Sequence, residues 1–255
     1  MRLPFDLPIH QHHGFVGREN LLDGLHRTFS RTASGTGHGA GQLGNIVVLH
    51  GLGGVGKTQL SVTYASTHRN EFDVIHWIDG TSKNNTLLSY QSLAQRLVNE
   101  AAQTSEDANA ARRDLASRMR IGENILADGR VKADGDALNK LARAVVQFLE
   151  SDTENFRWLL VIDNVDDLTS YPLGTFVPQS SRGRIIITTR LTEVTAYGLP
   201  IEVDQLELGT AVQILLNATK LRSKRPTGKS SLHSSANIAI GRYASRLLTI
   251  TNTSR

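Results

Sequence analysis

The fold of this chain is decided by residues 51–58, which read Gly51-Leu52-Gly53-Gly54-Val55-Gly56-Lys57-Thr58. The stretch fits the pattern G-x-x-x-x-G-K-[ST], in which successive backbone N–H groups form a nest for phosphate oxygens. Its glycines permit backbone torsions and a close approach that a Cβ would block. A chance glycine-rich turn is the alternative, but an apolar run precedes the stretch and a helical pattern follows it. The loop therefore predicts a ligand that contains phosphate.

Two side chains of the loop have their own predicted roles. The pattern assigns Lys57 to the β- and γ-phosphates and the hydroxyl of Thr58 to Mg²⁺. A helix that begins at the loop adds the positive end of its dipole to the site. The residues expected to contact the ligand here are Gly51, Gly53, Gly54, Val55, Gly56, Lys57, Thr58 and the following Gln59.

Apolar runs on both sides of the loop predict the fold class. Strands are expected at residues 45–50, 72–79, 158–163, 184–189 and 200–206. Most of these runs are near-continuous in Val, Ile and Leu, which is typical of a parallel sheet buried on both faces. Helical patterns lie between them, at residues 58–68, 86–101 and 136–150. Their alternation predicts the α/β class, as a three-layer α/β/α domain with a mainly parallel five-stranded sheet.

Two segments interrupt this alternation. Residues 31–44 are rich in Gly, Ser, Thr and Ala, and we interpret them as a flexible linker between an N-terminal helix and the first strand. Residues 102–135 are polar and rich in Ala and Arg, and we interpret them as an insertion between the second and third strands. Within the insertion we expect a helix at 108–119 and a loop at 121–135.

A second candidate group follows the third strand. Asp163 ends the apolar run from Trp158, and a carboxylate at such a strand tip can hold Mg²⁺ opposite Thr58. The next residue is Asn164, whose amide cannot accept a proton as a general base. Asp166 and Asp167 are the candidate catalytic carboxylates, and caps of the following turn are the alternative role for both. Hydrolysis is therefore less strongly predicted than binding.

The fourth predicted strand ends in Thr188, Thr189 and Arg190. A cation at that tip could sense or neutralise the γ-phosphate, although a lone arginine at a strand end is more often a surface residue. Ligands of open α/β sheets bind at the carboxyl ends of the strands. The loop, Asp163 and Arg190 all follow strands, so we expect them to meet at this edge.

Composition limits the remaining possibilities. The chain has 255 residues and no cysteine, which excludes disulfides and cysteine-ligated zinc. No apolar run approaches the roughly 18 residues that a membrane span needs. Together with the lack of a signal-peptide pattern, this predicts a cytoplasmic protein without a membrane partner.

The positive charge of the chain is unevenly distributed. The net charge is +4, but the residues after Glu207 include eight Lys or Arg and no acid, so residues 1–207 carry a net charge of −4. A basic tail can bind nucleic acid. Here the charges have almost no aromatic residues between them, so a solvated tail is favoured and nucleic acid is an unlikely partner.

The ordered set of motifs resembles the NB-ARC family, within the STAND class of P-loop NTPases. The resemblance rests on residues 15–19, 48–60, 74–79, 159–167, 185–190 and 203–216. The stretch at 159–167 resembles the fungal branch of the family. The Gly-Leu-Pro-Leu stretch and winged-helix part of the family have no counterpart, so we expect a chain truncated after its nucleotide-binding core, with an incomplete helical C-terminal extension.

The resemblance implies a ligand and a role. The ligand would be ADP or ATP with Mg²⁺, with Val16 and Arg18 on the adenine side. The role would be the core of a signalling switch with slow or no hydrolysis, which self-associates or binds a signalling protein. A productive ATPase or kinase and a nucleic-acid-binding regulator are the alternatives. The expected parts of the chain are a segment at 1–14, the nucleotide-binding domain at 15–206, the start of a helical subdomain at 207–222 and a basic tail at 223–255.

Overall fold

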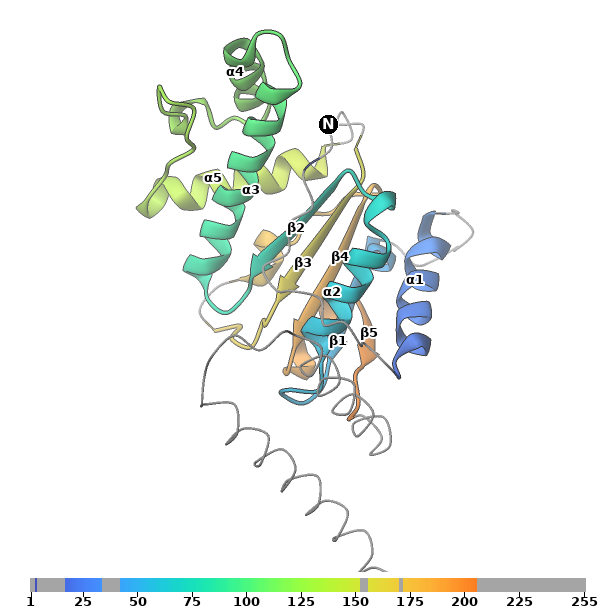
Figure 1. Cartoon of the computed structure of the whole chain (residues 1–255). Coiled ribbons are helices and arrows are strands. Elements are labelled where there is room, and N and C mark those ends of the chain that lie inside the picture. The colour runs from blue at the N-terminus through green and yellow to red at the C-terminus, as the bar shows by residue number, and fades with distance from the viewer. Residues whose placement is uncertain (1–2, 4–16, 34–41, 152–155, 170–171, 206–255) are drawn as a thin grey trace, which may run out of the picture. The chain divides into compact units, whose positions relative to one another are not determined.

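The computed structural model of the chain describes residues 3, 17–33, 42–151, 156–169 and 172–205 (Figure 1). Its contacts define two units, and nearly all described residues belong to the first, which comprises residues 1–12 and 18–205. Val16, the predicted helical subdomain at 207–222 and the basic tail at 223–255 lie outside the described residues. None of the described helices has both the length and the apolar character needed to cross a membrane.

The five predicted strands form one sheet. They are β1 (Ile46–His50), β2 (Val74–Asp79), β3 (Trp158–Asp163), β4 (Gly183–Thr189) and β5 (Leu199–Glu202). The strand order is β2-β3-β4-β1-β5 and every pairing is parallel, so the predicted sheet is confirmed. Because all strands run the same way, their carboxyl ends share one edge. The last strand is shorter than the predicted 200–206, because its partner β1 ends at His50, in register with Glu202.

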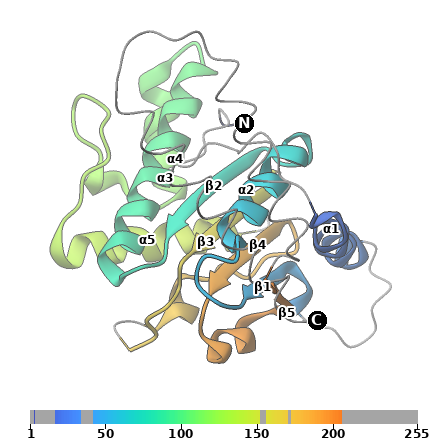
Figure 2. The same cartoon turned by 60° about the horizontal axis from the view of Figure 1, so that its bottom comes forward.

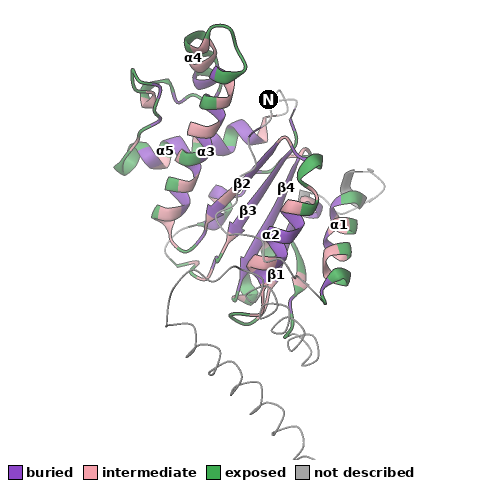
Figure 3. Ribbon diagram, viewed as in Figure 1, coloured by how far each residue is buried: buried purple, intermediate pink, exposed green. Residues whose placement is uncertain are grey.

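Helices cover both faces of this sheet (Figure 2). The described helices are α1 (Glu19–Ala33), α2 (Lys57–Thr67), α3 (Lys83–Gln103), α4 (Ala108–Arg118) and α5 (Gly135–Glu150), of which α4 packs on α3. Alternate strand residues such as Leu160 and Ile162 share one hydrophobic core with α3 and α5. Their neighbours Leu159 and Val161 point to the other face, where they are fully buried as well. The strands are thus buried on both sides, as the three-layer prediction requires (Figure 3).

Several predicted boundaries differ from those observed. The first helix continues to Ala33, into the predicted linker, and a 3-10 helix (Gln42–Asn45) occupies the end of that linker. The third helix begins at Lys83 rather than at residue 86, because the side chain of Ser82 caps it by accepting a hydrogen bond from the backbone N–H of Asn85 at 3.2 Å. Sequence periodicity does not register such a cap.

The polar insertion at 102–135 is more integrated than its composition predicts. Its helix α4 and its largely irregular segment after Ile121 are as expected, but its few apolar side chains enter the main core. These side chains are Leu115, Met119, Ile121 and Val131, and all are buried. Gln95 of α3 binds the backbone of this segment, with its Oε1 accepting from Val131 N–H at 2.6 Å. The segment is therefore part of the domain and not a loose appendage.

The buried His76 in β2 makes the stability of this fold depend on pH. Arg96 donates to Nδ1 at 2.8 Å, so the imidazole hydrogen lies on Nε2, which donates to the carbonyl of Ser89 at 2.9 Å. Burial, and to a lesser extent the charge of Arg96, lowers the pKa of His76 from 6.5 to about 4. The unfolded chain consequently binds more protons between these two values, and the free energy of unfolding falls as the pH falls through this window.

We expect this histidine to account for a loss of about 3 kcal/mol between pH 6.5 and pH 4, at 1.4 kcal/mol per pKa unit. Urea unfolding at several pH values measures the loss. A His76→Gln variant, which keeps a hydrogen-bonding side chain but does not titrate, should be less stable at pH 7 and lose less stability on acidification. An unchanged pH slope in this variant would assign the acid sensitivity to other groups.

Candidate functional site

The phosphate loop joins β1 to α2 in a conformation that needs glycine. Gly51, Gly54 and Gly56 have φ angles of 141°, 79° and 98°, in the region that other residues rarely adopt. A Cβ on Gly51 would also lie 2.5 Å from the carbonyl oxygen of Val203. The helix begins at Lys57, directly after Gly56, so its first backbone N–H groups face the loop. This arrangement is an anion nest at a helix N-terminus.

Lys57 spans the loop from the first turn of α2. Its Nζ donates hydrogen bonds to the carbonyls of Gly51 and Leu52 at 2.7 and 2.8 Å. Burial lowers the pKa of Lys57, while the charges of Asp166 and Asp163 raise it and that of Arg190 lowers it. The ammonium group therefore lies within electrostatic reach of the other predicted charged residues of the site.

Thr58 and Asp163 meet directly at the end of the sheet. The Thr58 hydroxyl donates to Oδ1 of Asp163 at 2.8 Å, and the Thr188 hydroxyl donates to the same oxygen at 2.5 Å. A hydroxyl and a carboxylate at this spacing are hard oxygen donors of the kind that Mg²⁺ prefers. The residues present thus fit a magnesium ion. Sequence reasoning noted the hydroxyl of Thr188 at its strand tip but assigned it no role.

Asn164 occupies its position for a conformational reason. Its φ angle is 66°, in the left-handed region, where asparagine is several times more frequent than most residues. Its N–H donates to the Thr188 hydroxyl at 2.8 Å, and the next N–H, that of Val165, donates to the Thr188 carbonyl at 2.9 Å. Asn164 thus turns the chain sharply after Asp163, and its side chain is exposed.

The two candidate catalytic carboxylates are used differently. Asp166 binds Arg190 twice: Oδ1 accepts the backbone N–H at 2.7 Å and Oδ2 lies 3.0 Å from Nε. The same guanidinium lies over the loop, because a Cβ added to Gly53 would contact it at 3.3 Å. Asp167 is exposed, and its Oδ1 accepts hydrogen bonds from the N–H and hydroxyl of Thr169 at 2.8 and 2.6 Å. Asp167 therefore caps its own turn, whereas Asp166 holds Arg190 beside the loop.

Arg18 reaches the same region from the start of α1. It is only 6 % exposed, and its Nη2 donates to the carbonyl of Asp204 at 2.6 Å. The preceding residue, Val203, contacts the start of the loop. Its carbonyl packs on Gly51, and its N–H donates to the carbonyl of His50 at 2.8 Å. Burial lowers the pKa of Arg18, partly opposed by the charge of Asp204. No pattern in the sequence predicts that Val203 and Asp204, which follow β5, contact the loop and Arg18.

Comparison with protein families identifies the domain that contains this loop. A model of the NB-ARC domain matches residues 38–220, which is well over half of the chain. A search of curated proteins finds no significant match. Among solved structures, Cdc6p from Pyrobaculum aerophilum has a TM-score of 0.49 and 14% identity, with 84% of this chain and 52% of that one covered.

A second solved structure is the ORC2 protein of Aeropyrum pernix, with a TM-score of 0.44 and 12% identity, covering 88% of this chain and 57% of that one. The chain thus spans little more than half the length of either structure. At these scores neither likeness adds to the argument, which rests on the family match and on the geometry of the loop.

Proposed function

Since the chain belongs to the NB-ARC family and is a nucleotide-binding P-loop NTPase module, we propose that it binds ADP or ATP with Mg²⁺ as the core of a signalling switch. The observation that carries the proposal is the contact between Thr58 and Asp163, 2.8 Å apart at the mouth of a glycine nest. This contact joins the phosphate loop to the predicted magnesium carboxylate, although 105 residues separate them in the chain.

Each residue of the site has a definite task in this proposal. The backbone N–H groups of the loop hold the phosphates, and Lys57 exchanges its two loop carbonyls for phosphate oxygens. Thr58 and Asp163 would hold Mg²⁺, which would neutralise negative charge on the phosphates. Arg190, beside Gly53, faces the terminal phosphate. The family resemblance assigns Arg18 to the adenine side, and Asp204 and Val203 connect this residue to the start of the loop.

The same contacts support the proposal that hydrolysis is slow. The residue directly after Asp163 is Asn164, an exposed amide that cannot take a proton from water. The carboxylate of Asp166 already accepts two contacts from Arg190, and Asp167 caps its turn. The site is therefore built to bind and to sense a nucleotide, and we propose that the protein acts in the cytoplasm through self-association or a signalling partner.

Isothermal titration of the purified chain with ADP and ATP, each with and without Mg²⁺, tests the proposal. We expect one site for each nucleotide, with Mg²⁺ strengthening ATP binding more than ADP binding. Turnover on the scale of enzymes, whose median is near 10 per second, would instead favour a productive ATPase. Absence of binding for both nucleotides would exclude the proposed role.

The pair between Asp166 and Arg190 gives a sharper prediction about catalysis. If Asp166 positions Arg190, Asp166→Asn should weaken ATP binding about threefold and leave ADP almost unaffected, since partly exposed ion pairs contribute under about 1 kcal/mol. Arg190→Ala should act on the same property, and the double variant should be no worse than Arg190→Ala alone. The neighbouring Asp167→Asn is the matched control and should change neither affinity. An Asp166→Asn variant that binds ATP normally but loses turnover would identify this carboxylate as a base.

A further inference from the structure

A cavity lies at the opposite end of the sheet from the phosphate loop. It has a volume of about 340 Å³ and is bounded by α1, α2 and the amino ends of β3 and β4. This volume lies within the range of small-molecule sites, about 300–1,000 Å³. Arg184 near the start of β4 lines the cavity, and six residues later Arg190 lies beside the loop, so about 20 Å of strand separates the two places.

Arg184 is the one buried charged residue among the described residues that line this cavity. It is 9 % exposed, and its guanidinium donates to three backbone carbonyls: those of Ser181 and Gly183 at 3.0 and 2.9 Å through Nη1, and that of Phe29 at 3.3 Å through Nη2. Within the described residues no carboxylate binds it. Burial lowers the pKa of Arg184. A buried charge is normally paired with an opposite charge, and neutral carbonyls do not supply one.

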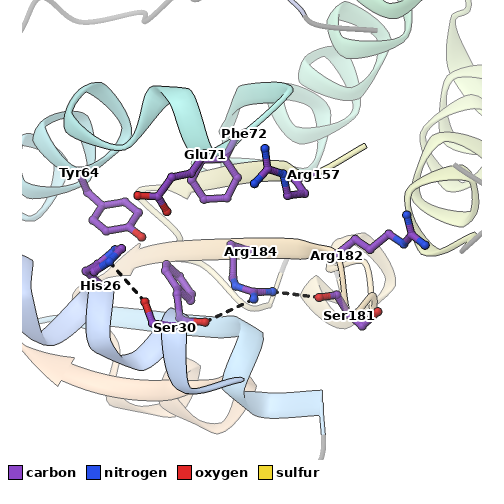
Figure 4. Close-up of a pocket in the computed structure, with 10 residues that line it drawn as sticks. His26, Ser30, Tyr64, Glu71, Phe72, Arg157, Ser181, Arg182 and Arg184 are labelled. Carbon is purple, nitrogen blue, oxygen red and sulfur yellow. Dashed lines mark hydrogen bonds between the residues drawn. The ribbon is translucent and has the colours of Figure 1, made fainter. Parts of the chain in front are cut away.

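The wall facing Arg184 supplies further hydrogen-bond donors. Tyr64 and Glu71 lie across the cavity from Arg184, with His26 and Ser30 at one end (Figure 4). Burial, reinforced by the charge of Glu71, raises the pKa of Tyr64, so its hydroxyl stays protonated and able to donate. Nδ1 of His26 is buried and has no hydrogen-bond partner in the described part of the chain. The hydroxyl of Tyr64 is therefore a further donor in the cavity besides Arg184.

Glu71 is the one acid among the described residues that line the cavity, and its carboxylate already makes a contact. Oε1 of Glu71 lies 2.6 Å from Nδ1 of His68. These two residues and His26 bring three possible metal ligands together, but the rings of His26 and His68 are stacked, 4.3 Å apart and only 13° from parallel. A metal ion lies in the plane of each imidazole that binds it, so two stacked rings cannot hold the same ion. The stacking of these two rings therefore argues against a metal ion shared by this cluster.

We propose that this cavity binds a small flat organic anion, an aromatic carboxylate or phosphate ester, with its charged group on Arg184 and Tyr64. A carboxylate or a phosphate matches the fork of a guanidinium, which has five N–H donors. Among the described residues, Arg184 makes three hydrogen bonds to backbone carbonyls and so has donors left for a ligand. The rings of Phe29 and Phe72 line the same cavity and offer an apolar surface to the body of the ligand. The inference is independent of nucleotide binding at the loop.

Benzoate, phenyl phosphate and the neutral benzamide are suitable probes. They are titrated into the Lys57→Ala variant, so that binding of phosphate at the loop does not interfere, and followed by chemical shifts in NMR spectra. We expect benzoate and phenyl phosphate to bind at least tenfold more tightly than benzamide, with the shifts centred on α1 and the start of β4. Equal binding of benzoate and benzamide, or shifts centred on the loop, would overturn the proposal.

Two variants separate the site from the fold. Tyr64→Phe removes one donor and keeps the ring, and we expect it to weaken benzoate about fivefold without loss of folding. Arg184→Lys keeps the charge but loses the fork, and should weaken benzoate at least tenfold if the variant folds. Arg113→Ala, an exposed arginine on α4, is the control and should bind normally. Benzoate binding that is unchanged in folded Tyr64→Phe would contradict the assigned contacts, even if the arginine variant does not fold.

Discussion

Replacement of Lys57 by alanine is expected to weaken ADP and ATP binding by about 100-fold or more. The reason is that hydrogen bonds to charged groups are worth about 1.5–3 kcal/mol each. Its Nζ is 2.7 and 2.8 Å from two loop carbonyls, in the position from which it can turn to phosphate. Titration calorimetry with both nucleotides measures the loss directly.

The control for this variant is Lys140→Ala. Lys140 is an exposed lysine of α5 with an ion pair to Asp136, and its removal should leave nucleotide affinity unchanged. Thermal unfolding followed by circular dichroism shows whether the alanine variant at Lys57 remains folded. If the Lys57→Ala variant is folded and binds ADP with normal affinity, Lys57 does not contact the phosphates and the proposed phosphate site is wrong.

Replacement of Asp163 by asparagine is expected to remove most of the effect of Mg²⁺ on ATP binding. The amide oxygen of asparagine can still accept the hydroxyls of Thr58 and Thr188, so the local packing is retained. The negative charge that Mg²⁺ requires is lost. We expect at least a tenfold loss of affinity for ATP in the presence of Mg²⁺ and little change when EDTA removes the ion.

Asp79→Asn is the matched control. Asp79 ends the neighbouring strand in register with Asp163, but its carboxylate accepts hydrogen bonds from Thr81 and Asn85 in its own turn. This variant should affect the stability of that turn and not the dependence on Mg²⁺. If both variants respond to Mg²⁺ as the unmodified chain does, the metal is held by other groups and the role given to Asp163 is wrong.

Most of the fold could be predicted because its signals are local. Each strand is a short run of β-branched and aliphatic residues, and a parallel sheet buries such runs on both faces. The phosphate loop is likewise local, since its glycines and Lys57 are consecutive in the sequence. The ends of the helices were harder to predict from the sequence. Two examples are the cap of α3 by Ser82 and the burial of Met119, at the end of α4, in the core.

The sequence by itself thus determined the α/β class, the order of the motifs and the edge of the sheet where the candidate site lies. Only the tertiary structure decided which charges meet. It assigned Asp166 to Arg190, 24 residues along the chain, and it placed Arg184 in a cavity between the layers without a carboxylate partner among the described residues. The physical reason is range: periodicity and turn chemistry act over a few neighbouring residues, whereas these contacts depend on strand register and on how the layers pack.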